Sequence, residues 1–474
     1  MKIKTLYRYL LLVPITFYGY SCKKLVEIPP PIDTIVSEQA FGTDNNANSA
    51  ILGIYAKLMN QSEILAFGNS AISIVGGLSS DELAIFGIDP GLSPIYHNQI
   101  ASDNGLVLTR LWQQPYEIIY QANACIEQLE RTENVSSPLK ERLTAEAKFI
   151  RSFVYFYLVN YFGETPLLTT TNYKENTISP RVAPDLIYEK IIDDLENSIS
   201  ALPDDFEQYN GERIRVTSWA AIALLSRIYL YIGDWEMADH YSSMVINSNL
   251  FSLVPTLNDV FLKNSNEAIL QLHVDGGLMP YNVLPESLLT LPSNRTSAPF
   301  LYYPNAFVNS FDSIDLRRVF WIDSTIYQGN TYFFPYKYKV GPSQMVPNST
   351  PTEYYMVLRL AEQYLIRAEA RAQKGDLAGS VADVNAIRLR AGLMPLTFDT
   401  KDDALYGILQ ERKKELMYEW GHRWLDMKRH DIADQIMAII APQKGGIWTP
   451  GAKFFPIPAA EIFRNPNLTQ NAGY

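Results

Sequence analysis

Apolar residues recur every three to four positions over most of this chain, and that spacing predicts a mainly helical protein. The pattern is clearest over residues 106–131, 139–162 and about 183–203. Gly163 directly follows the second of these segments, so we expect that helix to end there.

Two later segments repeat one arrangement of small residues around a glycine turn. In residues 218–247, Ser226 comes before a turn at Gly233–Asp234, and Ala238 follows it. In residues 362–393, the same offsets hold Ala368, then Gly375–Asp376, then Ser380. These offsets match the tetratricopeptide pattern, in which small residues let paired helices approach closely. Because the two copies are far apart in the sequence, we expect a helical scaffold with a large insertion and not a tandem array.

The insertion, about residues 251–350, has a different character. It is rich in Pro, Gly, Ser, Asn and aromatic residues, and residues 325–338 predict a small hairpin that turns near Gln328–Gly329–Asn330. A second irregular stretch covers residues 79–105. Irregular segments on a rigid scaffold often carry binding sites, so we expect these two stretches to converge in the fold.

The amino end predicts export. The apolar run at residues 10–21 is shorter than the roughly 20 residues that a membrane span needs, and basic residues precede it. This layout is that of a signal peptide, which we assign to residues 1–21. Small residues lead into Cys22 and resemble the bacterial lipobox, which predicts a lipid on Cys22 and anchoring to a membrane. The alternative is a chance cysteine in an ordinary signal peptide.

The predicted domain organisation follows from these patterns. The proline-rich residues 22–34 read as a lipidated tether. One large domain then covers residues 35–474, with its helical scaffold at about 35–250 and 351–474 around the insertion.

Composition narrows the possible functions. The net charge of −11 argues against nucleic acid as a partner. The chain has 30 Tyr, 21 Phe and 7 Trp, and aromatic residues beyond the needs of a core often line surfaces that bind sugars or peptides. Most of these rings are nevertheless expected to pack between helices.

Motifs for catalysis or cofactors are not found in the sequence. The five histidines form no HExxH pair and the two cysteines do not cluster, so we predict no metal site, and no cofactor apart from the lipid on Cys22. Cys125 lies in a helical pattern and reads as a small buried apolar residue. Asp81 and Glu82 are adjacent and would point in different directions, so they do not form a glycosidase pair. We therefore predict no catalytic residues.

Ligand-binding candidates come from the two irregular stretches. Flat sugar faces stack on aromatic rings, and sugar hydroxyls need polar partners. The candidates are Asp81, Tyr96, His97, Asn98, Arg295, Tyr302, Tyr303 and Trp321. For each of them the alternative is packing or simple exposure to solvent.

The segment 411–430 combines charge with tryptophan. On one expected helix, charged residues recur at three- and four-residue spacing, with two tryptophans four positions apart. These residues are Arg412, Glu415, Glu419, Trp420, Arg423, Trp424 and Asp426. A ligand groove is one interpretation. We favour a structural helix with salt bridges on one side and buried tryptophans on the other.

Four segments together resemble the SusD/RagB family, the outer-membrane lipoproteins of Bacteroidetes that capture nutrients. They are residues 145–168, 363–393, 411–430 and 454–474. The resemblance extends, in order, over essentially the whole mature chain. The resemblance implies a mainly α fold: a single large SusD-like domain with tetratricopeptide-like helix pairs and an irregular ligand-facing half with small β elements.

The resemblance also implies a function without catalysis. Such a protein would be lipid-anchored in the outer membrane and exposed at the cell surface, where it would bind an oligosaccharide or polysaccharide. It would deliver this nutrient to a SusC-like TonB-dependent barrel. Two alternatives remain open: a peptide-capturing member of the family, and a helical-repeat adaptor of the envelope that binds only protein.

Overall fold

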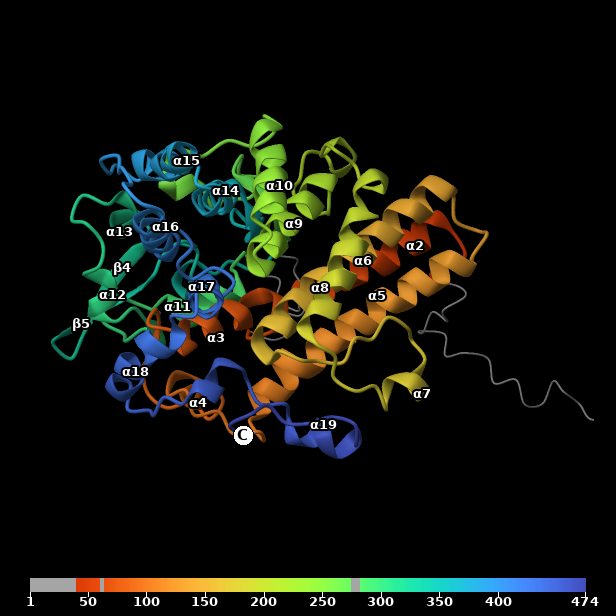
Figure 1. Cartoon of the computed structure of the whole chain (residues 1–474), viewed down its shortest axis with the longest axis horizontal. Helices are drawn as coiled ribbons and strands as arrows, with labels where there is room; N and C mark the ends of the chain where they lie inside the picture. Colours follow the sequence, from red (N-terminus) through yellow and green to blue (C-terminus); the bar gives the residue numbers. More distant parts are fainter. Residues whose placement is uncertain (1–39, 60–63, 274–281) are drawn as a thin grey trace, which may run out of the picture.

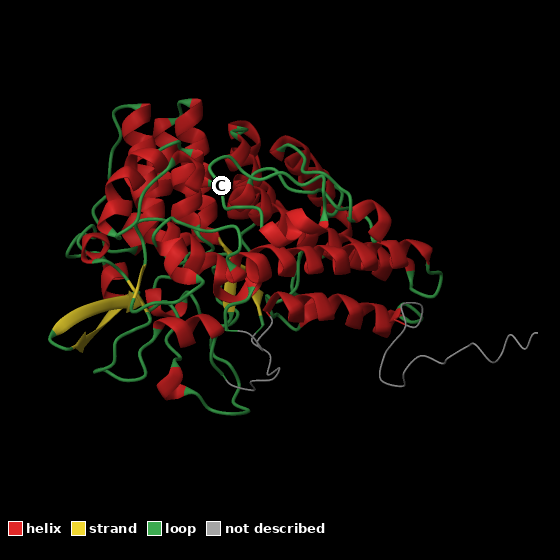
Figure 2. Cartoon of the chain, turned by 90° about the horizontal axis from the view of Figure 1, so that it is seen from below, coloured by secondary structure: helices red, strands yellow, loops and turns green. Residues whose placement is uncertain are grey.

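The computed structural model describes residues 40–59, 64–273 and 282–474. Within these residues the chain forms 18 α-helices and six short strands, so the predicted mainly α fold is confirmed (Figures 1 and 2). The predicted signal peptide, Cys22 and the tether lie outside the described residues. The division of the remaining chain into scaffold and insertion stays a prediction.

The first nine α-helices of the described chain lie between residues 44 and 247. They are α2 (Asp44–Met59), α3 (Ile72–Ser79), α4 (Leu92–Tyr96), α5 (Gln114–Arg131), α6 (Ser137–Phe162), α7 (Tyr173–Asn176), α8 (Pro184–Glu196), α9 (Ser218–Ile232) and α10 (Trp235–Asn247). The second half contributes α11 (Pro285–Thr290), α12 (Asn305–Val308), α13 (Leu316–Phe320), α14 (Leu360–Lys374), α15 (Leu377–Arg390), α16 (Lys401–Glu415), α17 (His422–Arg429), α18 (Ala433–Gln443) and α19 (Ala459–Arg464).

The six strands form three antiparallel pairs. They are β1 (Ala84–Ile85) with β3 (Leu301–Tyr302), β2 (Ala268–Leu272) with β6 (Tyr355–Arg359), and β4 (Ile322–Tyr327) with β5 (Asn330–Pro335). The last pair is the predicted hairpin. Its two-residue turn has φ of 48° at Gln328 and 79° at Gly329, as hairpin turns of this length favour.

The long helices follow the apolar pattern closely, with two differences. α6 ends before Gly163, whose φ of 71° stops the helix as expected. The segment 106–131 is not one α-helix, because a π-helical stretch at Val107–Gln113 precedes α5. The segment 183–203 is α-helical only as far as Glu196, and a short 3-10 helix follows at Ile199–Ala201. Between the two helices the Ser198 hydroxyl donates to the Asp194 carbonyl, a local side-chain bond of the kind that favours helix ends.

The two predicted helix pairs are present and have the same turn. Gly233 lies between α9 and α10 with φ of 77°, and Gly375 lies between α14 and α15 with φ of 89°. The aspartate after each glycine caps the next helix: Asp234 accepts from the Met237 amide at 3.1 Å, and Asp376 from the Gly379 amide at 2.9 Å. A left-handed glycine followed by an N-cap aspartate explains why both sequences fold alike.

These pairs pack against each other although the insertion separates them in the sequence. α14 contacts both α9 and α10, and the four helices lie side by side in Figure 1. The buried Ser226 hydroxyl lies 2.6 Å from Gln363 Oε1, and Arg227 Nε lies 2.6 Å from Glu362 Oε1. The insertion therefore begins and ends at one continuous helical layer.

The segment 411–430 corrects the sequence prediction, because it is not one helix. α16 ends at Glu415 and α17 begins at His422. Between them Tyr418, Trp420 and Gly421 have φ of 56°, 47° and 68°, values that no α-helix contains. The chain must bend here so that it fits closely against neighbouring elements.

Gly421 shows how close that fit is. A Cβ atom at this position would lie 2.7 Å from the Tyr161 hydroxyl oxygen and 3.3 Å from the Gly76 Cα. Trp420 and Trp424 are buried on either side of it. The structural interpretation of this segment is therefore confirmed, although two short elements replace the single helix.

Two charged residues of this segment, Glu415 and Glu419, belong to a buried ionic cluster centred on Arg359. Its guanidinium donates to Glu267, Glu415 and Glu419, each at 2.7 Å. Burial alone would raise the pKa of Glu419, but Arg359 and then Lys337 outweigh burial and lower it. Neighbouring cations likewise lower the pKa of Glu415 against burial, so Glu415 and Glu419 are ionised in the interior.

Replacing Arg359 with methionine should cost about 3–5 kcal/mol of unfolding free energy, because it leaves buried carboxylates without their shared partner. Lys374 is a matched control, since it pairs with Glu236 and Asp239 at the surface, where such pairs contribute less than about 1 kcal/mol. Urea unfolding followed by circular dichroism should separate Arg359→Met from Lys374→Met. Equal losses for the two variants would contradict this role of the cluster.

Candidate ligand-binding site

The two irregular stretches meet, as the sequence predicts. β1 comes from the first stretch and β3 from the insertion, with Ala84 opposite Tyr302. The Phe86 amide extends this pairing by donating to the Phe300 carbonyl at 2.8 Å. The hairpin joins them through the Tyr303 amide, which donates to the Phe333 carbonyl at 2.7 Å.

Aromatic side chains from all three segments form one partly exposed surface, which we call the tyrosine face. It consists of Phe86, Tyr96, Tyr302, Tyr327 and Tyr332. Ring centroids lie 5.6 Å apart for Phe86–Tyr327, 5.5 Å for Phe86–Tyr332 and 5.2 Å for Tyr302–Tyr332, all edge to face. Burial, and then the neighbouring Tyr302, raise the pKa of Tyr96, so these two phenols also lie close together.

A depression of about 520 Å³ opens on this face. It is lined by Tyr302, Tyr303, Asn305, Asn330, Thr331, Tyr332 and Phe333. Asn305, Asn330 and Thr331 are exposed and carry amide or hydroxyl groups. Aromatic rings beside side-chain amides can hold a flat, hydroxylated ligand, because the rings contact its C–H faces while the amides both donate and accept hydrogen bonds.

Three of the predicted site residues lie at this face. Tyr302 is at its centre, and Tyr96 ends α4, with the ring of His97 5.3 Å from its own. Lys444 Nζ lies 5.1 Å from the centroid of the Tyr96 ring, and burial lowers the pKa of Lys444 to about 7. The structure therefore brings together Tyr96, His97 and Tyr302.

Two other predicted residues lie in the interior. Trp321 has an exposed fraction of 0%, and its indole N–H donates to the Leu257 carbonyl at 2.9 Å. Tyr303 has an exposed fraction of 1% and stacks on Phe307 with centroids 4.8 Å apart. A stacking platform needs an open ring face, which neither residue has in this structure. Our proposal for the site leaves both out.

Asp81 and Asn98 also make structural contacts. Asp81 pairs with Arg423 at 2.7 Å and Lys413 at 2.8 Å; burial alone would raise its pKa, but these two cations lower it below the usual range. Asn98 is buried with φ of 56°, and its amide donates to the Ser79 carbonyl at 2.9 Å. Both side chains hold the first irregular stretch in place.

Arg295 is exposed, but it is engaged at the base of the hairpin. Its Nη1 atom lies 2.7 Å from Asp323 Oδ2 and 3.1 Å from the Ser324 carbonyl oxygen. It lies outside the residues that line the depression.

The sequence analysis missed Phe86, Tyr327 and Tyr332 as site residues. The predicted hairpin contained the signal for two of them. Thr325 pairs with Tyr332 and Tyr327 pairs with Asn330, and paired residues share one face of a hairpin. The register therefore places both tyrosines on the same side. The position of Phe86 depends on the pairing of β1 with β3, which the local sequence does not specify.

Three further observations concern groups outside the tyrosine face. Among the described residues, no three or more His, Cys, Asp or Glu side chains gather as metal ligands would. Cys125 is buried, as predicted, and burial raises the pKa of its thiol to about 12. No helix within the described ranges is both long and apolar enough to cross a membrane.

The described residues form a mainly α domain with tetratricopeptide-like helix pairs and an irregular half whose partly exposed surface is aromatic. Two family models match the chain: the SusD family over residues 322–474, and "starch-binding associating with outer membrane" over residues 91–230. The chain belongs to the SusD/RagB family, as the resemblance of its motifs predicts.

Individual relatives match along most of the chain. SusD-like protein P25 of Formosa agariphila is 24% identical over 543 aligned residues, covering 100% of both chains. The starch-binding protein SusD of Bacteroides thetaiotaomicron is 24% identical and covers 73% of this chain and 75% of its own.

Solved structures share the fold. A SusD superfamily protein from Bacteroides vulgatus has a TM-score of 0.78 at 22% identity, with 92% of this chain and 100% of that chain covered. Surface glycan-binding protein A from Bacteroides uniformis has a TM-score of 0.77 at 22% identity, with 91% and 100% covered. The shared architecture therefore includes both the helical layer and the irregular half.

The different settings of Trp321 and Tyr302 can be tested by their effects on stability. We expect Trp321→Ala to lower the unfolding free energy by about 3–5 kcal/mol, as removal of a fully buried aromatic side chain does. Tyr302→Ala should cost clearly less, because its ring is partly exposed. Chemical unfolding of both variants checks this expectation, and a loss at Tyr302 as large as that at Trp321 would show that the tyrosine face is part of the core.

Proposed function

We propose that this protein binds a neutral oligosaccharide or polysaccharide on the tyrosine face and does not change it chemically. The observation that carries the proposal is the meeting of three irregular segments in one partly exposed aromatic surface beside amide and hydroxyl groups. The names of two relatives, a starch-binding protein and a surface glycan-binding protein, support a carbohydrate as the ligand.

The chemistry of the face favours a sugar over a charged ligand. The side chains that line the depression are aromatic rings, amides and a hydroxyl, with no Asp, Glu, Lys or Arg among them. A site of this composition offers stacking and hydrogen bonding without a fixed charge to hold an ionic group. A peptide, whose ends are charged, is the second candidate and enters the test below.

A binding role without catalysis is supported by the contacts of Asp81 and Glu82, the two adjacent carboxylates that precede β1. Asp81 is held in two ion pairs, and the buried Glu82 accepts from the Tyr418 amide at 2.8 Å. Burial raises the pKa of Glu82 to about 7. Neither carboxylate lines the depression, so the acid and nucleophile pair of a glycosidase is not found there.

We further propose that the protein delivers its ligand to a SusC-like TonB-dependent transporter in the outer membrane. Membership of the SusD/RagB family supports this partner, and the name of the second family model supports the location. The lipid on Cys22 would tether the domain to the membrane through residues 22–34, and the predicted cell-surface position belongs to the same proposal.

Calorimetric titration tests the ligand. The chain from residue 22 with Cys22→Ala would be titrated with maltoheptaose, laminarihexaose, cellohexaose, mannohexaose and a set of short peptides. We expect binding to one glycan class, and Tyr302→Ala or Tyr332→Ala should weaken it by at least about tenfold, or about 1.4 kcal/mol. Tyr406→Ala is the control, because that ring is exposed on α16 and is not among the residues that line the depression.

The other outcomes of the titration are equally informative. Binding of peptides alone would make the protein a peptide-capturing member of the family. Silence toward every probe, with a barrel protein still copurifying, would favour the adaptor.

Membrane anchoring gives a separate prediction for Cys22. In the producing cells, Cys22→Ala should move the protein from the outer-membrane fraction to a soluble fraction, because a thiol-linked lipid can no longer form. Metabolic labelling with a fatty-acid analogue provides the direct readout. Label that persists in Cys22→Ala would contradict lipidation at this residue.

A further inference from the structure

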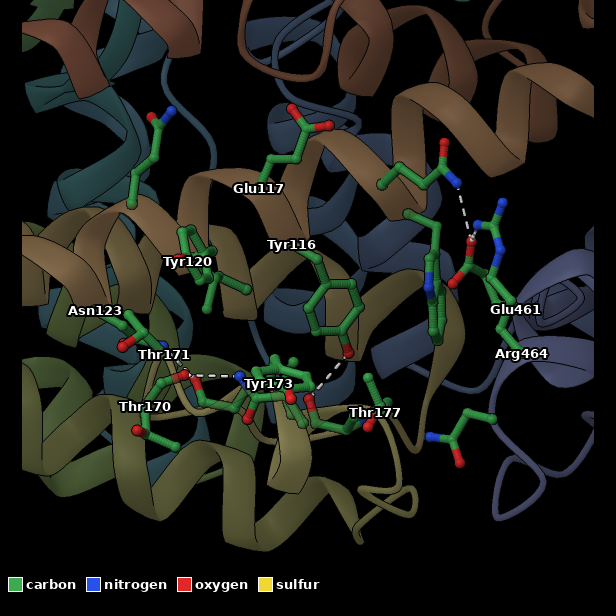
Figure 3. A pocket seen from close by; sticks show the side chains of 18 of the residues that line it. Tyr116, Glu117, Tyr120, Asn123, Thr170, Thr171, Tyr173, Thr177, Glu461 and Arg464 are labelled. Atoms are coloured by element: carbon green, nitrogen blue, oxygen red, sulfur yellow. Dashed lines mark hydrogen bonds and ion pairs between the residues drawn. The ribbon is translucent and has the colours of Figure 1, made fainter. Parts of the chain in front are cut away.

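A second surface of the molecule has the composition of a ligand site and takes no part in the function proposed above. It is a groove of about 670 Å³ between α5, the segment 166–177 and α19, which we call the α5 groove (Figure 3). Figure 1 shows α7 and α19 well away from the β4–β5 hairpin. The volume lies within the range of about 300–1,000 Å³ that is typical of small-molecule sites.

One wall of the groove is an aromatic row along α5 and the turn before it. Trp112, Tyr116 and Tyr120 are four residues apart, a spacing that places side chains on one side of a helix. Trp112 is buried, whereas Tyr120 has an exposed fraction of 53%. Tyr173 stands on the opposite wall with an exposed fraction of 68%, as Figure 3 shows. Two open rings therefore flank an aromatic floor.

The opposite wall is held in place by partly buried hydrogen bonds. The Tyr116 hydroxyl donates to the Pro166 carbonyl at 2.9 Å, and the Leu168 amide donates to the Tyr155 hydroxyl at 2.6 Å. The Asn123 amide donates to the Leu168 carbonyl at 2.9 Å.

Further hydrogen bonds and an ion pair fix the side chains that make these bonds. Arg151 donates to Asn123 Oδ1 at 2.6 Å and pairs with the buried Asp194. Further along, Glu127 accepts from the amide and the hydroxyl of Thr171, each at 2.7 Å. A wall fixed in this way is preorganised, so a ligand would lose little free energy in ordering it.

The charges of the groove cancel in pairs. Lys57 lies 2.7 Å from Glu117, and Arg464 lies 2.6 Å from Glu461. These are the charged side chains among the lining residues. The remaining polar lining consists of amides and hydroxyls, such as those of Gln121, Asn176 and Thr177. A neutral, hydroxylated ligand fits this environment better than an ion.

We infer that the α5 groove is a second saccharide-binding site, specific for a short, neutral oligosaccharide. The rings of Tyr120 and Tyr173 would contact the C–H faces of the sugar, and Gln121 and Asn176 would bind its hydroxyls. The inference rests on the proposed function for the class of ligand, but not for its location. Two separated sites on one rigid domain would increase the avidity for a long polysaccharide.

Calorimetry on the chain from residue 22 with Cys22→Ala tests this site, with the same four neutral oligosaccharides as probes. Tyr120→Ala/Tyr173→Ala removes the two open rings without disturbing the buried wall, and Tyr302→Ala/Tyr332→Ala removes the tyrosine face. Tyr406→Ala is again the control, with an exposed fraction of 68%, equal to that of Tyr173. Hydrogen exchange over residues 114–131 and 166–177 locates the bound ligand.

We expect two binding events for the best probe. The groove variant should weaken one event at least tenfold and abolish the ligand-dependent protection of residues 166–177, while the tyrosine-face variant should affect only the other. A single event that is lost in Tyr302→Ala/Tyr332→Ala and unchanged in the groove variant would overturn the second site and leave the proposed function intact. A single event that is lost only in the groove variant would support the groove and move the proposed function to it. Silence toward all four probes would overturn both.

Discussion

The buried contact between Arg359 and its carboxylates is the interaction on which the rest of this fold depends. Arg359 ends β6, Glu267 precedes β2 in the insertion, and Glu415 and Glu419 border the bend between α16 and α17. From the insertion, Arg317 donates to Glu411, and Lys337 to Glu419. Three parts of the chain that are distant in sequence are thus joined by charges that water cannot reach. Because a buried charge without its partner is very unfavourable, this arrangement fixes the register between the scaffold and the ligand-facing half.

Because these contacts join segments that are distant in the sequence, the sequence predicts the helical scaffold well but the site only in part. The helix ends at Gly163, Gly233 and Gly375 depend on local residues, so the pattern located them. The break after Glu415 does not, because it exists to place Gly421 against Gly76 and Tyr161. The local spacing of charges predicts a continuous helix there, but tertiary packing requires the helix to end at Glu415.

The predicted site residues likewise divide into those whose exposure the local sequence indicates and those whose burial depends on tertiary packing. Tyr302 lies on β3 and Tyr96 ends α4, in two segments whose irregular composition marks them as surface segments, and both side chains are exposed in part. Trp321 has equally polar neighbours in the sequence, but it lies under Lys337, whose Nζ is 4.5 Å from its ring centroid, and Arg359, whose guanidinium carbon is 5.9 Å away. Composition alone does not separate a ring that covers an ionic cluster from a ring that faces solvent. Whether a ring covers the cluster or faces solvent depends on how the strands of the insertion pair.

The two aromatic surfaces are built from different elements, so substitutions in them have different effects on the packing of the core. The tyrosine face is assembled from β1, β3 and the β4–β5 hairpin, whose turn at Gln328 and Gly329 projects beyond the core, so substitutions there alter the ligand surface with little effect on packing. The row formed by Trp112, Tyr116 and Tyr120 is part of the helical scaffold, and the Tyr116 hydroxyl also holds the facing wall. A change at Trp112 or Tyr116 therefore alters the core together with the groove, whereas the open ring of Tyr120 can change without altering the core. On these grounds, the tyrosine face is suited to discriminating between ligands, and the α5 groove to holding a common feature that different glycans share.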